Sequence, residues 1–306
     1  MAARPSPRIS TAPATAPWID DAVRAGGGVV VPPHEASGVV WTHSDDPAGL
    51  AALLDANPQV DWVQLPWAGI EPYLGLLGDG RTWSCAKGVY SDPVAEHALA
   101  LLLAGFRTLH RYSGEETWTA QEGRNLFDAA ITIFGGGGIG QVLVSLLQPF
   151  RCRVTVVRNR PEPMPGVARV LGPADRMAAL ADADAVVLAL PLLPGTEGLI
   201  GAAELEAMAS HAWLVNVARG RHVQTDALVA ALRDGRIGGA ALDVTDPEPL
   251  PDGHPLWSLP NVIITPHTGN TKAMARPLLG ARIAENVRRY AAGEPLVGLI
   301  DEGAGY

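Results

Sequence analysis

The sequence predicts a protein of the α/β class with two domains, each built on a doubly wound parallel sheet that helices cover on both faces. Short apolar runs alternate with helical segments from residue 131 onward, and a looser version of this alternation occupies residues 8–90. The length of 306 residues is enough for two domains of ordinary size. An apolar content of 47% and a charged content of 18% are typical of a globular protein.

Apolar runs in the second half of the chain predict the strands of the larger sheet. They read "ITIF", "VTVV", "AVVLAL", "WLVNV", "GAALDV" and "NVIITP". Strands that are buried on both faces of a parallel sheet need such continuous apolar residues. The segment 271–295 follows the last run and predicts a terminal helix that ends at Gly293.

The first half predicts a smaller sheet, with strands in the runs "GGGVVVP", "SGVVWT", "VDWVQLPW" and "RTWSCAKG". Asp46 and Pro47 are predicted to begin a helix, as its N-cap and its first residue. Residues 1–17 are rich in Pro, Ala and Ser and are predicted to be partly loose. Residues 91–112 predict one long helix, with Asp92 as its N-cap and Pro93 as its first residue. This helix is apolar nearly all round, which predicts that it is buried, and another copy of the same helix is the partner that we consider.

Composition excludes several classes of function. The net charge of −9 argues against a non-specific binder of nucleic acid or of anionic membranes. Cys85 and Cys152 cannot form a disulfide framework and lie in no metal-binding spacing, so we expect no metal site and a reduced, cytoplasmic setting. No apolar segment is long enough to span a bilayer, and residues 1–17 lack the apolar core of a secretion signal.

A glycine-rich turn lies between the first run of the larger sheet and a helical segment, in "ITIFGGGGIGQVLVSLLQPF". Gly135, Gly137 and Gly140 fit the pattern G-x-G-x-x-G in this strand–turn–helix setting. The first glycine permits a tight turn, the second lets the backbone approach a pyrophosphate, and the third permits close packing of helix on strand. The segment therefore predicts a dinucleotide-binding site at the N-terminus of a helix.

The next strand, "VTVV", ends in the polar cluster Arg158, Asn159 and Arg160. In this type of unit the end of the second strand meets the adenine ribose, and an acidic residue there binds the 2′-hydroxyl. A guanidinium instead accepts a 2′-phosphate through charge-assisted hydrogen bonds. The cluster therefore predicts NADP rather than NAD. The alternatives are that Arg158 stacks on adenine without discriminating, or that the cluster is an ordinary solvated strand end.

Three polar residues follow other strands of the same sheet: Arg219, Glu248 and His267. Open α/β folds bind ligands at the ends of their strands, so we expect these side chains to share one site. Each alone has an ordinary structural explanation. Together they suit the reduction of a 2-oxo acid by a nicotinamide. Arg219 is a cation that can bind the carboxylate of the acid, His267 is a proton donor for its carbonyl oxygen, and Glu248 is a carboxylate that can orient the donor.

These motifs resemble the D-isomer-specific 2-hydroxyacid dehydrogenase family, particularly its glyoxylate/hydroxypyruvate reductase-like members. The similar segments are "GGGGIG", "LPLLPGTEGLIGAAEL", "LVNVARGRHVQTDAL", "AALDVTDPEPLP" and "PLWSLPNVIITPHTG", and "VAEHALALLLA" and "NVRRYAAGEPL" extend the similarity over nearly the whole chain. The resemblance implies two Rossmann-like domains, with a dinucleotide-binding domain (93–270) inserted into a smaller substrate domain (1–92 with 271–306). It also implies a homodimer formed through the helix at 93–112.

The resemblance also implies roles for individual residues. Arg219 binds the substrate carboxylate, and His267 acts as general acid in reduction and as base in oxidation. Glu248 is the partner that raises the pKa of His267. Further cofactor contacts are implied for Gly138, Ile139, Leu190, Pro191, Thr196, Val217, Ala218 and, at the carboxamide, Asp243. The backbone N–H groups around Trp67, Ala68 and Gly69 are implied to cradle the substrate carboxylate.

Two departures narrow the prediction within the family. Trp41 and Thr42 stand where members that act on 3-phosphoglycerate carry an arginine–serine pair, which disfavours a phosphorylated substrate. Glutamate rather than glutamine at Glu248 disfavours the formate dehydrogenase branch. We therefore predict NADPH-dependent reduction of a small 2-oxo acid, with glyoxylate or hydroxypyruvate first. NAD-linked oxidation of a D-2-hydroxy acid and a nucleotide-sensing, corepressor-like binding module are the alternatives.

Overall fold

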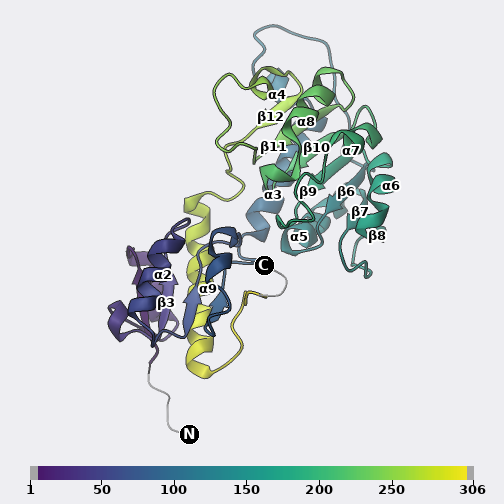
Figure 1. Cartoon of the computed structure of the whole chain (residues 1–306). Coiled ribbons are helices and arrows are strands. Elements are labelled where there is room, and N and C mark those ends of the chain that lie inside the picture. The colour runs from purple at the N-terminus through teal and green to yellow at the C-terminus, as the bar shows by residue number, and fades with distance from the viewer. Residues whose placement is uncertain (1–5, 302–306) are drawn as a thin grey trace. The chain divides into compact units, whose positions relative to one another are not determined.

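The computed structural model describes residues 6–301, and these form two compact units (Figure 1). The first comprises the described residues up to Tyr90 together with those from Thr271 onward, and the second comprises Ser91–Asn270. Every strand pairing in both sheets is parallel, so the predicted α/β class is confirmed. Among the described residues, no helix combines the length and hydrophobicity of a membrane span.

The second unit is built on a sheet in the order β12-β11-β10-β9-β6-β7-β8. Its strands are β6 (Ala130–Phe134), β7 (Arg153–Val157), β8 (Arg169–Leu171), β9 (Ala185–Leu188), β10 (Trp213–Asn216), β11 (Gly239–Leu242) and β12 (Val262–Ile264). The strand order reverses between β6 and β9, and in open α/β sheets such a switch point is where ligands bind. The predicted runs form strands, and the edge strand β8 was missed because its sequence, RVL, offers only two apolar residues in a row and none of the three is fully buried.

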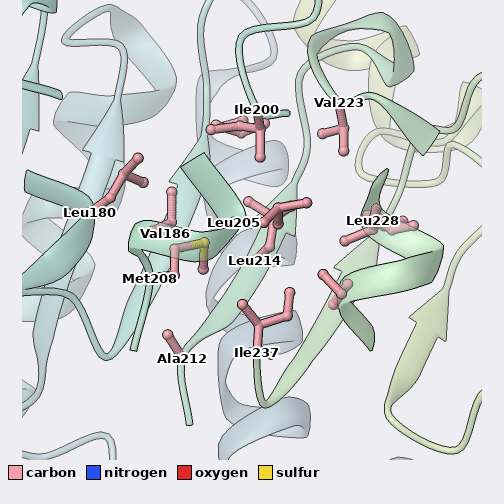
Figure 2. Close-up of a cluster of buried hydrophobic side chains, with 14 of the residues drawn as sticks. Leu180, Val186, Ile200, Leu205, Met208, Ala212, Leu214, Val223, Leu228 and Ile237 are labelled. Carbon is pink, nitrogen blue, oxygen red and sulfur yellow. The ribbon is translucent and has the colours of Figure 1, made fainter. Parts of the chain in front are cut away.

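Helices cover both faces of this sheet. They are α3 (Ser91–Phe106), α4 (Leu109–Tyr112), α5 (Gly138–Leu147), α6 (Arg176–Ala181), α7 (Ala202–Ala207) and α8 (Thr225–Arg233). One apolar core joins Leu180, Leu205 and Leu228, from α6, α7 and α8, to Val186 and Leu214 of the sheet, as Figure 2 shows. Side chains on the other face, from α3 and α5, form a second core with the alternate strand residues. Burial on both faces explains why the strands are apolar throughout.

The predicted helix over 91–112 is wrong in two respects. It breaks after α3, because Thr108 adopts a left-handed conformation with φ 55° and α4 begins at the next residue. Beyond Phe106 no residue of α4 is buried, and Leu109 is half exposed. The helix also begins at Ser91, so Asp92 is not the N-cap but lies in the first turn, where its charge still favours the helix N-terminus.

The first unit contains a smaller sheet in the order β2-β1-β3-β4-β5. Its elements are β1 (Arg8–Ala12), α1 (Pro17–Ala25), β2 (Val29–Val30), β3 (Gly38–Trp41), α2 (Pro47–Ala56), β4 (Trp62–Gln64), β5 (Thr82–Ser84) and α9 (Lys272–Ala292). Short 3₁₀ helices lie at Pro33–Glu35 and Glu71–Leu76 in this unit and at Gln148–Phe150, Pro173–Asp175, Gly220–His222 and Pro255–Ser258 in the other. The order reverses between β1 and β3, as in a doubly wound sheet.

Part of the predicted loose segment 1–17 is a central strand. Residues 1–5 lie outside the described part of the chain, but Arg8–Ala12 form β1 between β2 and β3. Ile9 and Ser10 are buried there, and the small polar residues of "RISTA" hid the strand pattern. The predicted helix starts and ends elsewhere are confirmed: Asp46 caps α2 by accepting from the N–H of Gly49 at 2.8 Å, and Gly293 ends α9 with φ 70°.

A buried polar network joins α9 to the smaller sheet. The side-chain amide of Asn286, fully buried, donates to Gln64 Oε1 at 2.7 Å and to the carbonyl of Val297 at 2.9 Å. Its oxygen accepts from the N–H of Val297 at 2.8 Å. Ser84 donates to Gln64 Oε1 at 2.9 Å and accepts from the indole of Trp62 at the same distance. Each buried polar group is therefore paired, as the interior requires.

We expect Asn286→Ala to lower the free energy of unfolding by about 2–4 kcal/mol, because it leaves buried partners without hydrogen bonds. Urea unfolding followed by tryptophan fluorescence measures this loss, since Trp62 belongs to the network. Gln59→Ala is the matched control: this side chain is exposed in the same unit and, within residues 6–301, bonds only the carbonyl of Pro33. A comparable loss in both variants would contradict the role given to the network.

Candidate active site

The glycine-rich turn connects β6 to α5. Gly135 has φ 112°, and a Cβ there would lie 2.1 Å from the carbonyl oxygen of Ala189. A Cβ on Gly140 would lie 2.1 Å from the carbonyl oxygen of Gly135, so the helix packs directly onto the turn. Gly137 is the N-cap of α5, and a Cβ on it would meet nothing within 4 Å. The turn thus leaves open space beside the free N–H groups of the first helical turn, which attract anions.

Arg158 follows β7 and lies against this turn. A Cβ on Gly136 would come within 3.0 Å of the Cδ of Arg158 and 3.3 Å of its Nε. Asn159 and Arg160 follow and are exposed. Within residues 6–301, no carboxylate forms an ion pair with Arg158 or Arg160, whereas Arg151 pairs with Asp128 and Arg169 with Asp182. Arg158 therefore lies beside the turn and Arg160 is exposed after β7, and neither has an acidic partner among the described residues.

The other predicted cofactor residues follow β6, β9 and β10. Gly138 and Ile139 begin α5, and the loop after β9 carries Leu190, Pro191 and Thr196. Thr196 closes that loop, because its hydroxyl donates to the carbonyl of Pro191 at 3.0 Å and accepts from the N–H of Leu193 at 2.9 Å. Val217 and Ala218 are buried at the end of β10, and the N–H of Ala218 donates to Asn216 Oδ1 at 3.0 Å.

His267 and Glu248 form a close pair. The Nδ1 atom of His267 lies 2.7 Å from Glu248 Oε1, and both side chains are about half exposed. The hydrogen bond to Glu248 raises the pKa of His267, against a smaller opposing effect of burial. The same bond is the main cause that lowers the pKa of Glu248. The pair therefore favours a positively charged imidazole beside a carboxylate.

Arg219 lies close enough to act on both members of the pair. Its positive charge is among the weaker causes that lower the pKa of Glu248, and it opposes the rise in the pKa of His267. Its Nη1 donates to the carbonyl of Ala218 at 2.8 Å. Its own carbonyl accepts from Asn216 Nδ2 at 2.8 Å, which fixes the backbone directly after β10. The fold thus brings together the three residues that the sequence singled out.

The loop that carries His267 is held by Asp243, at the end of β11. Asp243 is 4% exposed, and its carboxylate has five partner groups. They are the hydroxyl of Thr265 at 2.6 Å, the N–H groups of Thr268 at 2.8 Å and Gly269 at 2.9 Å, the imidazole of His97 at 3.2 Å and, at 3.5 Å, the hydroxyl of Thr268. Burial by itself raises the pKa of Asp243, but these hydrogen bonds outweigh it and bring the value to about 2. Asp243 therefore remains a carboxylate.

The predicted substrate loop, Trp67, Ala68 and Gly69, follows β4 in the first unit. The hydroxyl of Tyr90 donates to the carbonyl of Pro66 at 2.7 Å, and the rings of Trp67 and Tyr90 lie 5.4 Å apart. The carbonyl of Trp67 accepts from the N–H of Ala86 at 3.1 Å. In the described part of the chain, the N–H groups of residues 67–69 have no protein acceptor. Successive free N–H groups are typical of anion-binding loops.

Sequence reasoning missed His97, Thr265 and His222. His97 lies on α3, more than a hundred residues before its partner Asp243, and no spacing rule connects them. Thr265 lies two residues before His267 in "TPH". This closeness to His267 was the only sign in the sequence that Thr265 belongs to the site. His222 follows Arg219 by three residues and is fully buried. Among residues 6–301, no cluster of three or more His, Cys, Asp or Glu side chains is arranged to hold a metal ion.

Comparison with known proteins identifies the family. Residues 97–269 match the model of the D-isomer specific 2-hydroxyacid dehydrogenase, NAD binding domain. The chain belongs to this family. It is 39% identical, over 260 residues, to an uncharacterized protein in the proB 3′ region of Corynebacterium melassecola, and the match covers 82% of this chain and 86% of that protein.

Solved structures of the family share the whole fold. A D-isomer specific 2-hydroxyacid dehydrogenase from Xanthobacter autotrophicus Py2, in complex with NADPH and MES, superposes with a TM-score of 0.85 at 28% identity, covering 99% of this chain and 100% of that one. The NADPH-dependent glyoxylate/hydroxypyruvate reductase from Sinorhizobium meliloti, in complex with NADP and sulfate, superposes with a TM-score of 0.81. Its identity is 24%, over 98% of this chain and 100% of that one, and this likeness bears on the fold alone.

The predicted family and the two Rossmann-like domains are therefore confirmed. The protein is a 2-hydroxyacid dehydrogenase-type oxidoreductase with a nicotinamide-dinucleotide-binding domain. The choice of NADP over NAD, the substrate, the homodimer and the cytoplasmic location stay predictions.

We expect Glu248→Gln to lower the pKa of His267 towards its ordinary value of 6.5, because a neutral amide no longer stabilises the imidazolium. An NMR titration of the imidazole resonances measures this pKa. In the unsubstituted protein, the pair stabilises the folded state fully at a pH below the ordinary pKa of histidine. This stabilisation is lost as the pH rises through the raised pKa of His267. Asp246→Asn, which removes an exposed carboxylate two residues away, is the control. Equal titration curves for His267 in all three proteins would rule out the pairing.

Proposed function

We propose that the protein reduces a small 2-oxo acid to the D-2-hydroxy acid with NADPH, and that glyoxylate and hydroxypyruvate are the first substrates to test. The observation that carries the proposal is the 2.7 Å contact between His267 Nδ1 and Glu248, with the charge of Arg219 acting on both. An imidazolium held in this way offers its other nitrogen, Nε2, as a proton donor. A carbonyl that becomes an alkoxide during reduction needs such a donor.

Each residue of the trio has a defined part in the reaction. Arg219 binds the substrate carboxylate and orients the carbonyl group. His267 donates its Nε2 proton to the carbonyl oxygen, and Glu248 retains the Nδ1–H. When bound, the reduced nicotinamide supplies the hydride that adds to C2 of the acid. In the oxidative direction, His267 accepts the proton of the hydroxyl group instead.

The residues beside the glycine turn fit a phosphorylated dinucleotide. The open space at Gly137 and the free N–H groups of α5 suit a pyrophosphate, for which we propose Gly135, Gly138, Ile139 and Gly140 as further contacts. Arg158 and Arg160, without acidic partners in the described chain, suit a 2′-phosphate, with Asn159 between them. The Xanthobacter structure with bound NADPH, at 28% identity, supports the same choice. Leu190, Pro191, Thr196, Val217, Ala218 and Asp243 complete the proposed cofactor site.

The first unit supports a small, unphosphorylated acid. The free N–H groups of Trp67, Ala68 and Gly69 suit a carboxylate. Trp41, at the end of β3, is 1% exposed, and its indole donates to the hydroxyl of Tyr73 at 3.0 Å. This position therefore offers no cation to a substrate phosphate.

We also propose a homodimer formed through residues 93–112. Leu109 is 53% exposed, and Trp118, in the segment that follows α4, is 96% exposed. Exposed apolar side chains of this size are typical of surfaces that another chain covers. Light scattering coupled to gel filtration measures the mass, and a monomer at micromolar concentration would contradict this assembly.

Oxidation of the reduced nicotinamide at 340 nm tests the function directly. NADPH and NADH are compared against glyoxylate, hydroxypyruvate, pyruvate and a bulky aryl 2-oxo acid. Faster turnover with NADPH and a small acid supports the proposal. Preference for NADH favours an NAD-linked role in oxidation, and binding without turnover favours a nucleotide sensor.

His267→Ala is expected to lower kcat by about 10²–10⁴-fold, the usual contribution of a general acid. Steady-state kinetics with the best 2-oxo acid measures the loss. His254→Ala serves as the control, because this imidazole accepts the N–H of Leu256 and is bonded to neither Glu248 nor His267. Near-normal kcat in His267→Ala would remove His267 from the mechanism.

Arg158→Asp is expected to shift preference from NADPH towards NADH, because a carboxylate repels the 2′-phosphate and accepts a ribose hydroxyl. The ratio of kcat/KM for the two cofactors reports the change. Arg153→Asp is the control, because it makes the same change of charge at the opposite end of β7. Arg153 is the first residue of that strand and is exposed. An unchanged ratio in Arg158→Asp, or the same shift in both variants, would disprove the phosphate clamp.

A further inference from the structure

His222 occupies an unusual position between two loops of the candidate site. It ends the 3₁₀ turn Gly220–His222, three residues after Arg219, and is fully buried. Its Nδ1 atom lies 3.0 Å from the carbonyl oxygen of Arg219. Its Nε2 atom lies 3.2 Å from the carbonyl oxygen of Pro191, in the loop after β9. One imidazole thus links the backbone of the proposed substrate arginine to the backbone of the proposed cofactor loop.

Backbone hydrogen bonds join the same two loops next to His222. The N–H of Gly198 donates to the carbonyl of Arg221 at 2.8 Å, and the N–H of Ile200 donates to the carbonyl of His222 at 2.9 Å. The N–H of Gln224 returns a bond to the carbonyl of Ile200 at 2.9 Å. The segments 198–200 and 221–224 therefore form one connected strip, and the imidazole extends this connection towards the ligand-binding end.

We propose that His222 is a positioning residue that couples the substrate side of the site to the cofactor side. The inference rests on the proposed function, since it assigns Arg219 to the acid and Pro191 to the dinucleotide. Carbonyl oxygens only accept hydrogen bonds, so a ring nitrogen that carries hydrogen donates to the carbonyl beside it, to Arg219 from Nδ1 or to Pro191 from Nε2. Each contact restrains one loop, and the rigid ring transmits the position of one loop to the other.

The local hydrogen bonding indicates that the fold tolerates loss of this ring. The carbonyl of Arg219 still accepts from Asn216 Nδ2 at 2.8 Å, and the carbonyl of Pro191 still accepts from the hydroxyl of Thr196 at 3.0 Å. Neither carbonyl is left without a donor when His222 is replaced. Substitutions therefore remove positioning rather than a last buried hydrogen bond.

Two substitutions separate the two contacts. In His222→Asn, the amide nitrogen takes the place of Nδ1 and keeps the bond to Arg219, whereas the bond to Pro191 is lost. In His222→Gln, the amide nitrogen takes the place of Nε2 and keeps only the bond to Pro191. We expect His222→Asn to raise the KM for NADPH, and His222→Gln the KM for the 2-oxo acid, by about three- to tenfold each. His222→Leu raises both. A merely structural residue would not produce this crossed pattern.

Steady-state kinetics with each substrate varied in turn measures the pattern. His211→Asn is the matched control, because it removes an imidazole bonded to Asp184 at the amino end of the same sheet, and both KM values stay unchanged. Unchanged KM values in folded His222→Asn and His222→Gln, or equal changes in both, would overturn the proposal.

One readout does not require turnover. Titration of NADPH fluorescence gives a Kd that rises in His222→Asn but not in His222→Gln. An unchanged Kd in folded His222→Asn would overturn the coupling even if the enzyme reduces 2-oxo acids. Absence of turnover, with the Kd values as expected, would count against the proposed function alone.

Discussion

The buried carboxylate of Asp243 is the interaction on which the geometry of the candidate site depends. His267 has φ 52°, a left-handed backbone that costs a residue other than glycine about 1–3 kcal/mol. Its N–H donates to the carbonyl of Asp243, and the side chain of Asp243 accepts hydrogen bonds from Thr265 and Thr268, before and after His267. A carboxylate that is 4% exposed is stable only when donors surround it. The requirement to satisfy Asp243 and the requirement to hold His267 are thus met by the same hydrogen bonds.

The parallel sheet explains why residues so far apart in sequence meet in one unit. Strands of the larger sheet are each followed by a part of the site: β6 by the glycine turn, β7 by Arg158, β10 by Arg219, β11 by Asp243 and β12 by His267. In a parallel sheet all carboxyl ends lie at the same edge, so every strand delivers one loop to that edge. The strands themselves are buried between two apolar cores and are apolar throughout. The loops that follow the carboxyl ends, rather than the strands themselves, are therefore the parts of these segments placed to contact a ligand.

This arrangement determines how much could be predicted from sequence. Continuous apolar runs identified the central strands, and the residues after them identified Arg219, Glu248 and His267. The strand β1 was missed because it mixes small polar residues with apolar ones, and β8 because it offers only two apolar residues in a row. The break at Thr108 was missed because apolar periodicity does not report where a core ends. His97 and His222 were missed because their roles depend on which backbone and side-chain groups packing brings next to the imidazole.

The two carboxylates near His267 differ in burial, and this difference separates their effects. Glu248 is about half exposed and is bonded to the imidazole of His267. Its attraction to the ring is therefore strong when the ring is protonated and weak when the ring is neutral. Asp243 is buried, has a pKa of about 2 and takes its hydrogen bonds from groups other than the His267 ring. When His267 gives up its proton, the attraction of Glu248 falls, but the bonds between Asp243 and residues 265–269 are unaffected. The loop can therefore keep its conformation while the charge on His267 changes, which the proposed role of His267 as a proton donor requires.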